Sequence, residues 1–103
     1  MFDSVHRLAF LEFWHEIRRN PTIARIHRDL YAGYRRRIGR LFRQAARESG
    51  AIVNSRRAAI GLLALLDGLW LELSLDDNGY SHTDAQAICE TYVDLLLTAG
   101  TNR

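Results

Sequence analysis

The 103 residues are enough for one domain with a modest core, and we expect a single domain over residues 1–103. With 48% hydrophobic and 25% charged residues, the composition is that of an ordinary soluble domain. The single cysteine, Cys89, excludes an internal disulfide framework. The N-terminal residues lack the basic region, apolar run and cleavage site of a secretory signal, so we expect a cytoplasmic location.

The net charge of +2 conceals a strong asymmetry along the chain. Residues 18–57 hold twelve arginines and two acids, which gives a net charge of +10. Residues 58–102 hold seven acids and no arginine, which gives −7. Opposite charges attract, so we expect the basic and acidic parts to draw together as the chain folds.

Four helices are predicted in chain order, because no alternating apolar and polar run typical of a strand is present. The first helix runs from about Ser4 to Arg19. Phe13, Trp14 and Ile17 belong to its broad apolar face, which must pack against the rest of the chain.

The second helix is predicted to begin at Pro21, which suits the first helical position, with Asn20 as its N-cap. Apolar residues then repeat every three or four positions as far as Ala45. Gly50 is typical of the residue that follows a helix, so nearly thirty residues form one helix more than about 40 Å long. A separate stripe on this helix consists of arginines: Arg25, Arg36, Arg40, Arg43 and Arg47.

The third helix is predicted over Ala58 to Leu75, with Asn54 or Ser55 as its N-cap. It ends before the turn-forming residues 76–79, Asp-Asp-Asn-Gly. The fourth helix follows after Ser81, whose side chain suits an N-cap.

The stretch from Ala58 to Leu75 is apolar almost all the way round, interrupted by Asp67 and Glu72. A helix with one face in water would show a polar stripe, so we expect burial on two sides, by the rest of the chain and by a second copy. As a membrane span the stretch is short, at about 27 Å, and Asp67 near its middle is costly in lipid. We therefore expect no contact with a membrane.

Motifs for metal binding and catalysis are weak. Glu12 and His15 have a Glu-x-x-His spacing, but carboxylate-bridged two-metal bundles need that motif twice, so chance is the better interpretation. The four histidines are scattered, without a Cys/His zinc spacing, and no glycine-rich phosphate loop is present. Cys89 lies on the apolar side of the fourth helix, as an inert core cysteine does. We expect no metal, no cofactor and no enzymatic activity.

The arginine stripe has two interpretations. Twelve arginines in forty residues provide phosphate contacts for a nucleic acid. However, aromatic residues are not interleaved for base stacking, and an acidic segment follows. The residues favour a solvated helix face that the acidic half partly neutralises.

Asp67 is the acid that most needs an explanation. Its spacing alone favours a carboxylate that is paired with an arginine or hydrogen-bonded within the core, because an unpaired buried carboxylate is expensive. The alternative is a pocket between the first three helices, where an acid among aromatic rings suits an organic cation. The residues of this pocket are Trp14, Tyr31, Tyr34, Asp67 and Trp70.

Four sequence blocks carry a resemblance to a known family: LAFLEFW at residues 8–14, NPT at 20–22, YRR at 34–36 and ALLDGLWL at 64–71. In this order and spacing they resemble the C-terminal domain of TetR-family transcriptional repressors. Within that family the chain is most similar to the BetI-like branch, the regulators of choline-to-glycine-betaine genes. The resemblance covers roughly residues 5–97, and LDGLWL is its most specific part.

The resemblance implies an all-helical bundle that binds a small-molecule effector, such as choline, and dimerises through its last two helices. It implies a four-helix interface between subunits, for which the candidates are Leu62, Leu65, Leu69, Ile88 and Tyr92. The helix-turn-helix domain with which such repressors begin is not present in this chain, so operator DNA is expected to be bound only through that domain. The alternative function is a stand-alone helical interaction module that binds an acidic partner or a nucleic acid through the arginine-rich helix.

Overall fold

The computed structural model describes residues 4–76 and 79–98. These residues form four α-helices and no strand: α1 (Ser4–Arg19), α2 (Pro21–Ser49), α3 (Ser55–Leu75) and α4 (His82–Thr98). The prediction of an all-α fold is therefore confirmed. In the turn that was predicted between the last two helices, residues 77–78 lie outside the described part of the chain.

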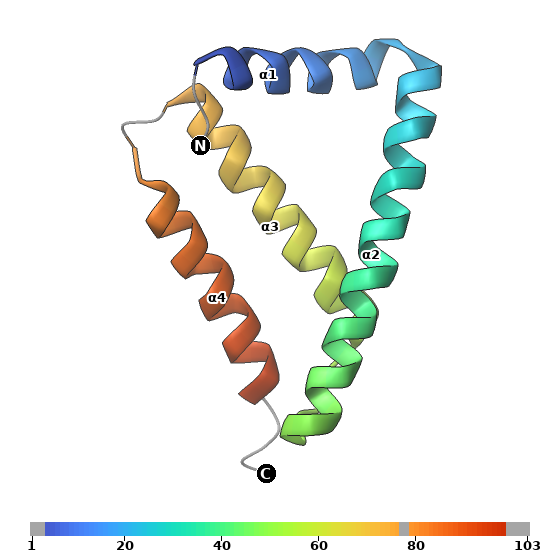
Figure 1. The fold of residues 1–103 in the computed structure, drawn as a ribbon, viewed down its shortest axis with the longest axis vertical. Coiled ribbons are helices and arrows are strands. Elements are labelled where there is room, and N and C mark those ends of the chain that lie inside the picture. The colour runs from blue at the N-terminus through green and yellow to red at the C-terminus, as the bar shows by residue number, and fades with distance from the viewer. Residues whose placement is uncertain (1–3, 77–78, 99–103) are drawn as a thin grey trace.

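The corner between α1 and α2 is built by Asn20 and Pro21, as predicted (Figure 1). The side chain of Asn20 accepts hydrogen bonds from the backbone N–H groups of Thr22 and Ile23, at 3.0 and 3.3 Å. These donors have no partner within the helix, so the cap stabilises its first turn. Pro21 disfavours helical geometry in the residue before it, so α1 stops at Arg19 and the chain turns.

Gly50 ends α2 in the left-handed conformation, with φ of 79°. Its N–H donates to the carbonyl oxygen of Ala46 over 2.8 Å. Glycine adopts this conformation without the steric cost that a Cβ atom adds, which is why it is common at helix C-termini.

The caps of α3 and α4 are also formed by residues next to each helix start. Asn54 accepts a hydrogen bond from the N–H of Arg57 at 3.0 Å, so α3 begins at Ser55 with Asn54, one of the two predicted caps, as its N-cap. At α4, Ser81 Oγ accepts from the N–H of Asp84 at 3.0 Å, and the Asp84 carboxylate accepts from the N–H of Ser81 at 3.1 Å. This reciprocal pair satisfies two donors at the helix start.

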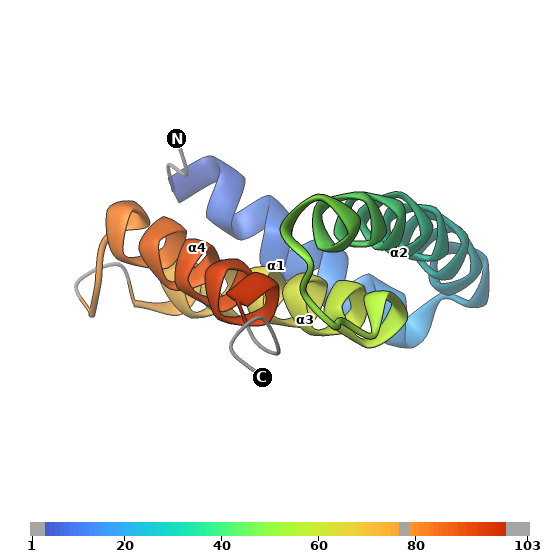
Figure 2. The same cartoon turned by 90° about the horizontal axis from the view of Figure 1, so that it is seen from below.

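The helix α3 is the centre of the fold, because it packs against α1, α2 and α4. In Figure 1, α1 crosses one end of the molecule and α2 and α4 lie on either side of α3. The molecule measures 46 × 33 × 17 Å, and Figure 2 shows how thin it is in the view from below. A helix with side chains is about 10–12 Å across, so a slab of this thickness covers few residues completely. Among the described residues, the buried apolar ones are few and mostly small: Phe42, Ala58, Ala59, Leu73 and Ala85.

Much of the apolar surface of α3 stays uncovered. Its most apolar stretch has a mean hydropathy of 1.7, and only 22% of that stretch is buried. With 21 residues α3 is long and apolar enough to cross a membrane, which corrects the expectation that it is too short. This is weak evidence for a span, because the core helix of a soluble protein meets the same criterion.

Candidate functional site

Tyr31 of α2 and Asp67 of α3 are joined by a hydrogen bond. The Tyr31 hydroxyl donates to Asp67 Oδ1 over 3.0 Å, and both side chains are half-buried. Burial raises the pKa of Asp67, although the hydrogen bond from Tyr31 and the nearby His27 act in the opposite direction. Burial and the adjacent Asp67 carboxylate raise the pKa of Tyr31 to about 12. The pair therefore places a partly desolvated acid at the contact between two helices.

Aromatic rings surround this pair. The imidazole of His27 stacks on the Tyr31 ring with 4.0 Å between centroids, and the Trp14 ring lies 5.4 Å from His27. The Tyr34 ring lies 5.5 Å from Tyr31. We call Trp14, His27, Tyr31, Tyr34 and Asp67 the acid–aromatic cluster. Four of these five residues were predicted to line a common pocket, and the structure brings those four together.

His27 is the member of the cluster that the sequence did not single out. Its Nε2 atom is buried and has no hydrogen-bond partner among the described residues. Buried polar atoms are normally paired, so this atom of His27 is an exception within the cluster. The sequence does contain a signal for His27: it lies four residues before Tyr31, which places both side chains on one face of α2.

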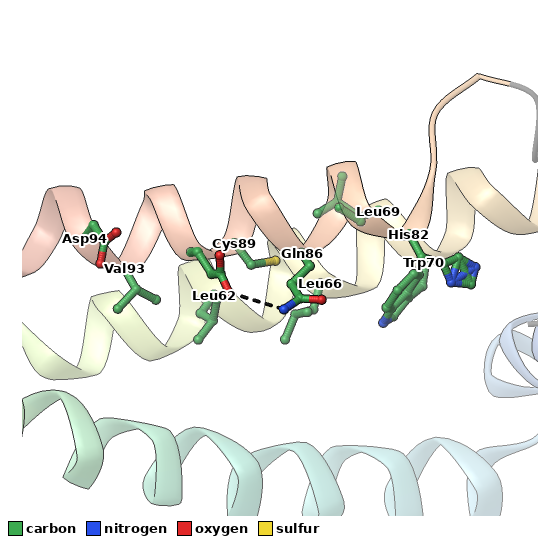
Figure 3. Close-up of a pocket in the computed structure, with 11 residues that line it drawn as sticks. Leu62, Leu66, Leu69, Trp70, His82, Gln86, Cys89, Val93 and Asp94 are labelled. Atoms are coloured by element: carbon green, nitrogen blue, oxygen red, sulfur yellow. Dashed lines mark hydrogen bonds between the residues drawn. The ribbon is translucent and has the colours of Figure 1, made fainter. Parts of the chain in front are cut away.

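Trp70, the fifth predicted pocket residue, lies beside His82 of α4, with 5.0 Å between ring centroids. It lines a hollow of about 810 Å³ between α3 and α4, which we call the α3–α4 hollow (Figure 3). A hydrogen bond of 3.3 Å from Gln86 to Glu90 runs along its wall (Figure 3). The lining residues are Leu62, Leu66, Leu69, Trp70, His82, Ala85, Gln86, Cys89, Glu90, Val93 and Asp94.

None of the residues that line this hollow on α4 was predicted as a site residue. Cys89 was expected to be an inert core thiol, and it is half-buried, with its pKa raised by burial. A thiol with a raised pKa holds little thiolate at neutral pH and is a poor nucleophile. Among the described residues, no group of three or more histidine, cysteine or acidic side chains is arranged to hold a metal.

The predicted interface residues fall into two groups. Leu62 and Leu69 line the α3–α4 hollow, and the Tyr92 hydroxyl donates to the carbonyl oxygen of Ala58 over 3.1 Å within the same chain. These three residues therefore have intrachain contacts. Leu65 is half-buried, and Ile88 is 45% exposed.

A bundle of four helices around a central apolar helix fits the C-terminal domain of a transcriptional regulator. The family described as the C-terminal domain of BetI-type transcriptional repressors, a branch of the TetR family, matches residues 1–98. The chain therefore belongs to this family, as the resemblance of its four sequence blocks indicated.

Curated relatives agree with this assignment. The chain is 33% identical over 94 residues to the HTH-type transcriptional regulator BetI 2 of Chromohalobacter salexigens, a match that covers 87% of this chain and 42% of that protein. It is 34% identical over 89 residues to BetI of Paraburkholderia phymatum, covering 86% of this chain and 43% of that protein. BetI of Proteus mirabilis is 32% identical over 93 residues, with 86% and 42% covered.

The chain thus spans less than half the length of these relatives. Among solved structures, none gives a significant match.

Proposed function

We propose that this chain is the cytoplasmic effector-binding and dimerisation part of a repressor, and that a small organic cation such as choline is its effector. The proposal includes no enzymatic activity, since the family is one of transcriptional regulators. Operator DNA is bound, on this proposal, by a helix-turn-helix domain that is not part of residues 1–103.

The observation that carries the effector proposal is the Tyr31–Asp67 hydrogen bond within a group of aromatic rings. A half-buried carboxylate costs free energy that a bound cation offsets. Aromatic faces attract a quaternary ammonium group by about 0.5–2 kcal/mol for each well-placed ring. This part of the structure already holds one such contact, because the Arg37 guanidinium lies 5.8 Å from the centroid of the Tyr34 ring.

The α3–α4 hollow is the second location for the effector. It combines Trp70 with the carboxylates of Glu90 and Asp94, and its volume of about 810 Å³ lies within the range of small-molecule sites. The acid–aromatic cluster and the α3–α4 hollow share no residue, so a substitution in one location tests that location alone.

The effector proposal is tested by titrating choline into the chain and following tryptophan fluorescence. We expect saturable binding that Asp67→Asn weakens at least tenfold and that Glu90→Gln leaves within twofold. The neutral isostere 3,3-dimethyl-1-butanol controls for apolar contact and is expected to bind poorly. If Glu90→Gln weakens binding and Asp67→Asn does not, the effector site is the α3–α4 hollow. If choline up to millimolar concentration gives no response, choline is not the effector.

The dimerisation proposal is supported by uncovered apolar residues on α3 and α4. Ile88 and Leu95 of α4 are 45% and 65% exposed. On α3, Ala64 and Gly68 are exposed one turn apart. Apart from neighbouring atoms of α3 itself, no atom of the described residues lies within 4 Å of the position that a Cβ atom of Gly68 takes. A glycine inside a helix costs about 0.5–1 kcal/mol relative to alanine, so the glycine at this open position calls for a reason. We propose that Gly68 allows a second copy of α3 to approach closely.

Light scattering on the purified chain tests the dimer. We expect a dimer at micromolar concentration, which Leu95→Asp converts to a monomer because a charge enters the apolar interface. Ile26→Asp is the matched control, since Ile26 is 59% exposed but lies on α2. A monomeric wild-type chain, or equal dissociation by both variants, would contradict the proposed interface.

A further inference from the structure

A second hollow, of about 450 Å³, lies between α2 and the first half of α3. We call it the arginine hollow. Five of its eight lining residues are arginines, and the other three have small or aliphatic side chains: Arg35, Arg36, Arg40, Arg43, Arg56, Ala32, Gly39 and Ile60. It shares no residue with the acid–aromatic cluster or with the α3–α4 hollow.

The spacing of residues on α2 and a close helix contact create this hollow. Arg36, Arg40 and Arg43 recur every three or four positions and so lie on one face of α2. Gly39 is buried between them, and a Cβ atom there would lie 3.7 Å from the carbonyl oxygen of Ser55. The absence of a side chain at Gly39 lets the start of α3 approach α2, which brings Arg56 to the same hollow.

Within residues 4–76 and 79–98, no ion pair neutralises the positive charge of the hollow. Among the described residues none of its five arginines forms an ion pair, and their one hydrogen bond runs from Arg43 Nη1 to Ser55 Oγ at 3.4 Å. We predicted that the acidic half of the chain partly neutralises the arginine stripe. In this part of the structure, no direct ion pair does so. The acids of α3 and α4 lie elsewhere, with Asp67 bonded to Tyr31.

The first turn of α3 adds a second anomaly. It holds Arg56 and Arg57 and no acidic residue. The N-terminus of a helix carries a partial positive charge that favours anions, so two arginines there are unfavourable without a counter-charge. Departures of this kind from local preference are typical of functional sites.

We propose that the arginine hollow binds a small ligand that carries two or more phosphoryl groups. Guanidinium groups form paired hydrogen bonds with phosphate oxygens, and several around one hollow match several such groups. A volume of about 450 Å³ is that of a small-molecule site. No aromatic side chain from the described part of the chain lines the hollow, and single-stranded nucleic acids use such side chains as a stacking platform.

Calorimetric titration with inorganic tripolyphosphate at low salt tests the proposal. We expect one saturable site per chain, which Arg40→Gln weakens at least tenfold because a charge-assisted hydrogen bond is lost. The matched control is Arg47→Gln, which removes the same charge from an exposed position of the same helix, outside the hollow, and is expected to change the affinity less than twofold. Both positions are exposed, so both variants should keep the fold, which circular dichroism verifies.

Three results would overturn the proposal. Absence of binding at millimolar tripolyphosphate would show that the hollow is only a solvated charge cluster. Equal loss of affinity in both variants would show general electrostatic attraction without a site. Tighter binding of a short DNA duplex than of tripolyphosphate, abolished by Arg40→Gln, would assign the surface to nucleic acid instead. Asp67→Asn is expected to leave tripolyphosphate binding unchanged, so this result is independent of the effector proposal.

Discussion

The hydroxyl of Tyr31 donates a hydrogen bond of 3.0 Å to the carboxylate of Asp67, which lies 36 residues further along the chain. This contact joins the longest helix, α2, to the central helix, α3. It also explains how an acid is tolerated in the most apolar stretch of the sequence, because the carboxylate has a donor and is only half-buried.

Removing the donor should destabilise the fold. Tyr31→Phe leaves the half-buried carboxylate of Asp67 without its hydrogen bond, and we expect a loss of about 1–3 kcal/mol in the free energy of unfolding. Urea denaturation measures the loss. Tyr34→Phe is the matched control, because the hydroxyl of Tyr34 makes no hydrogen bond among the described residues, and a similar loss in both variants would contradict the assignment.

The raised pKa of Asp67 predicts a pH dependence of stability. As pH rises from the ordinary value of 3.8 towards the higher pKa in the folded chain, the unfolded state releases its proton first, so stability falls across this interval. Above the folded pKa the loss is complete. Asp67→Asn has no such group, so the stability of wild type relative to this variant should fall with pH in that window and then stay constant. Urea denaturation at several pH values measures this difference, and a rise with pH would contradict the prediction.

Two glycines of α3 should respond oppositely to alanine. A Cβ atom at Gly61 would meet the side chain of Tyr92, whose hydroxyl donates to the Ala58 carbonyl oxygen. We expect Gly61→Ala to cost about 1–3 kcal/mol, since the Tyr92 ring must move.

At Gly68, no atom of the described residues beyond the adjacent part of α3 lies within 4 Å of the Cβ position. Gly68→Ala should therefore stabilise the isolated chain by about 0.5–1 kcal/mol, through the lower backbone entropy of alanine in the unfolded state. Thermal unfolding at low protein concentration measures both variants. Destabilisation of the isolated chain by Gly68→Ala would show that this position has an intrachain contact.

The cap of α4 gives a local prediction. Ser81→Ala removes the acceptor for the N–H of Asp84, and we expect a loss of about 1 kcal/mol. Thr83→Ala, one position before Asp84 and exposed, should change stability by less than about 0.5 kcal/mol. Thermal denaturation of both variants distinguishes the loss of the cap from a general effect of alanine on stability.

The helices were predictable because their ends depend on neighbouring residues. Asn20 with Pro21 begins α2, Gly50 ends it, and Ser81 begins α4, as the sequence predicts. Asn54 was one of the two N-caps predicted for α3, and it is the one that the structure uses. Family membership was also predictable, since it rests on the order and spacing of short blocks along the chain.

The composition of the candidate sites depended on contacts between helices. Asp67 and Trp70 were predicted to line the same pocket, and a spacing of three residues places them on one face of α3. That face is broad enough to meet both α2 and α4. Asp67 bonds to Tyr31, while Trp70 packs beside His82. The arginine hollow around Gly39 could not be predicted either. The net charge of a stretch of sequence does not show which charged side chains lie close together in the fold.

The sequence by itself therefore determined the four helices and the family. The helices follow from residues within a few positions of one another, and the family follows from the order and spacing of four short blocks. The tertiary structure decided which faces meet, and so separated the acid–aromatic cluster, the α3–α4 hollow and the arginine hollow. The physical reason is that an apolar helix such as α3 has no single preferred face, so its partners are selected by packing with residues distant in the chain.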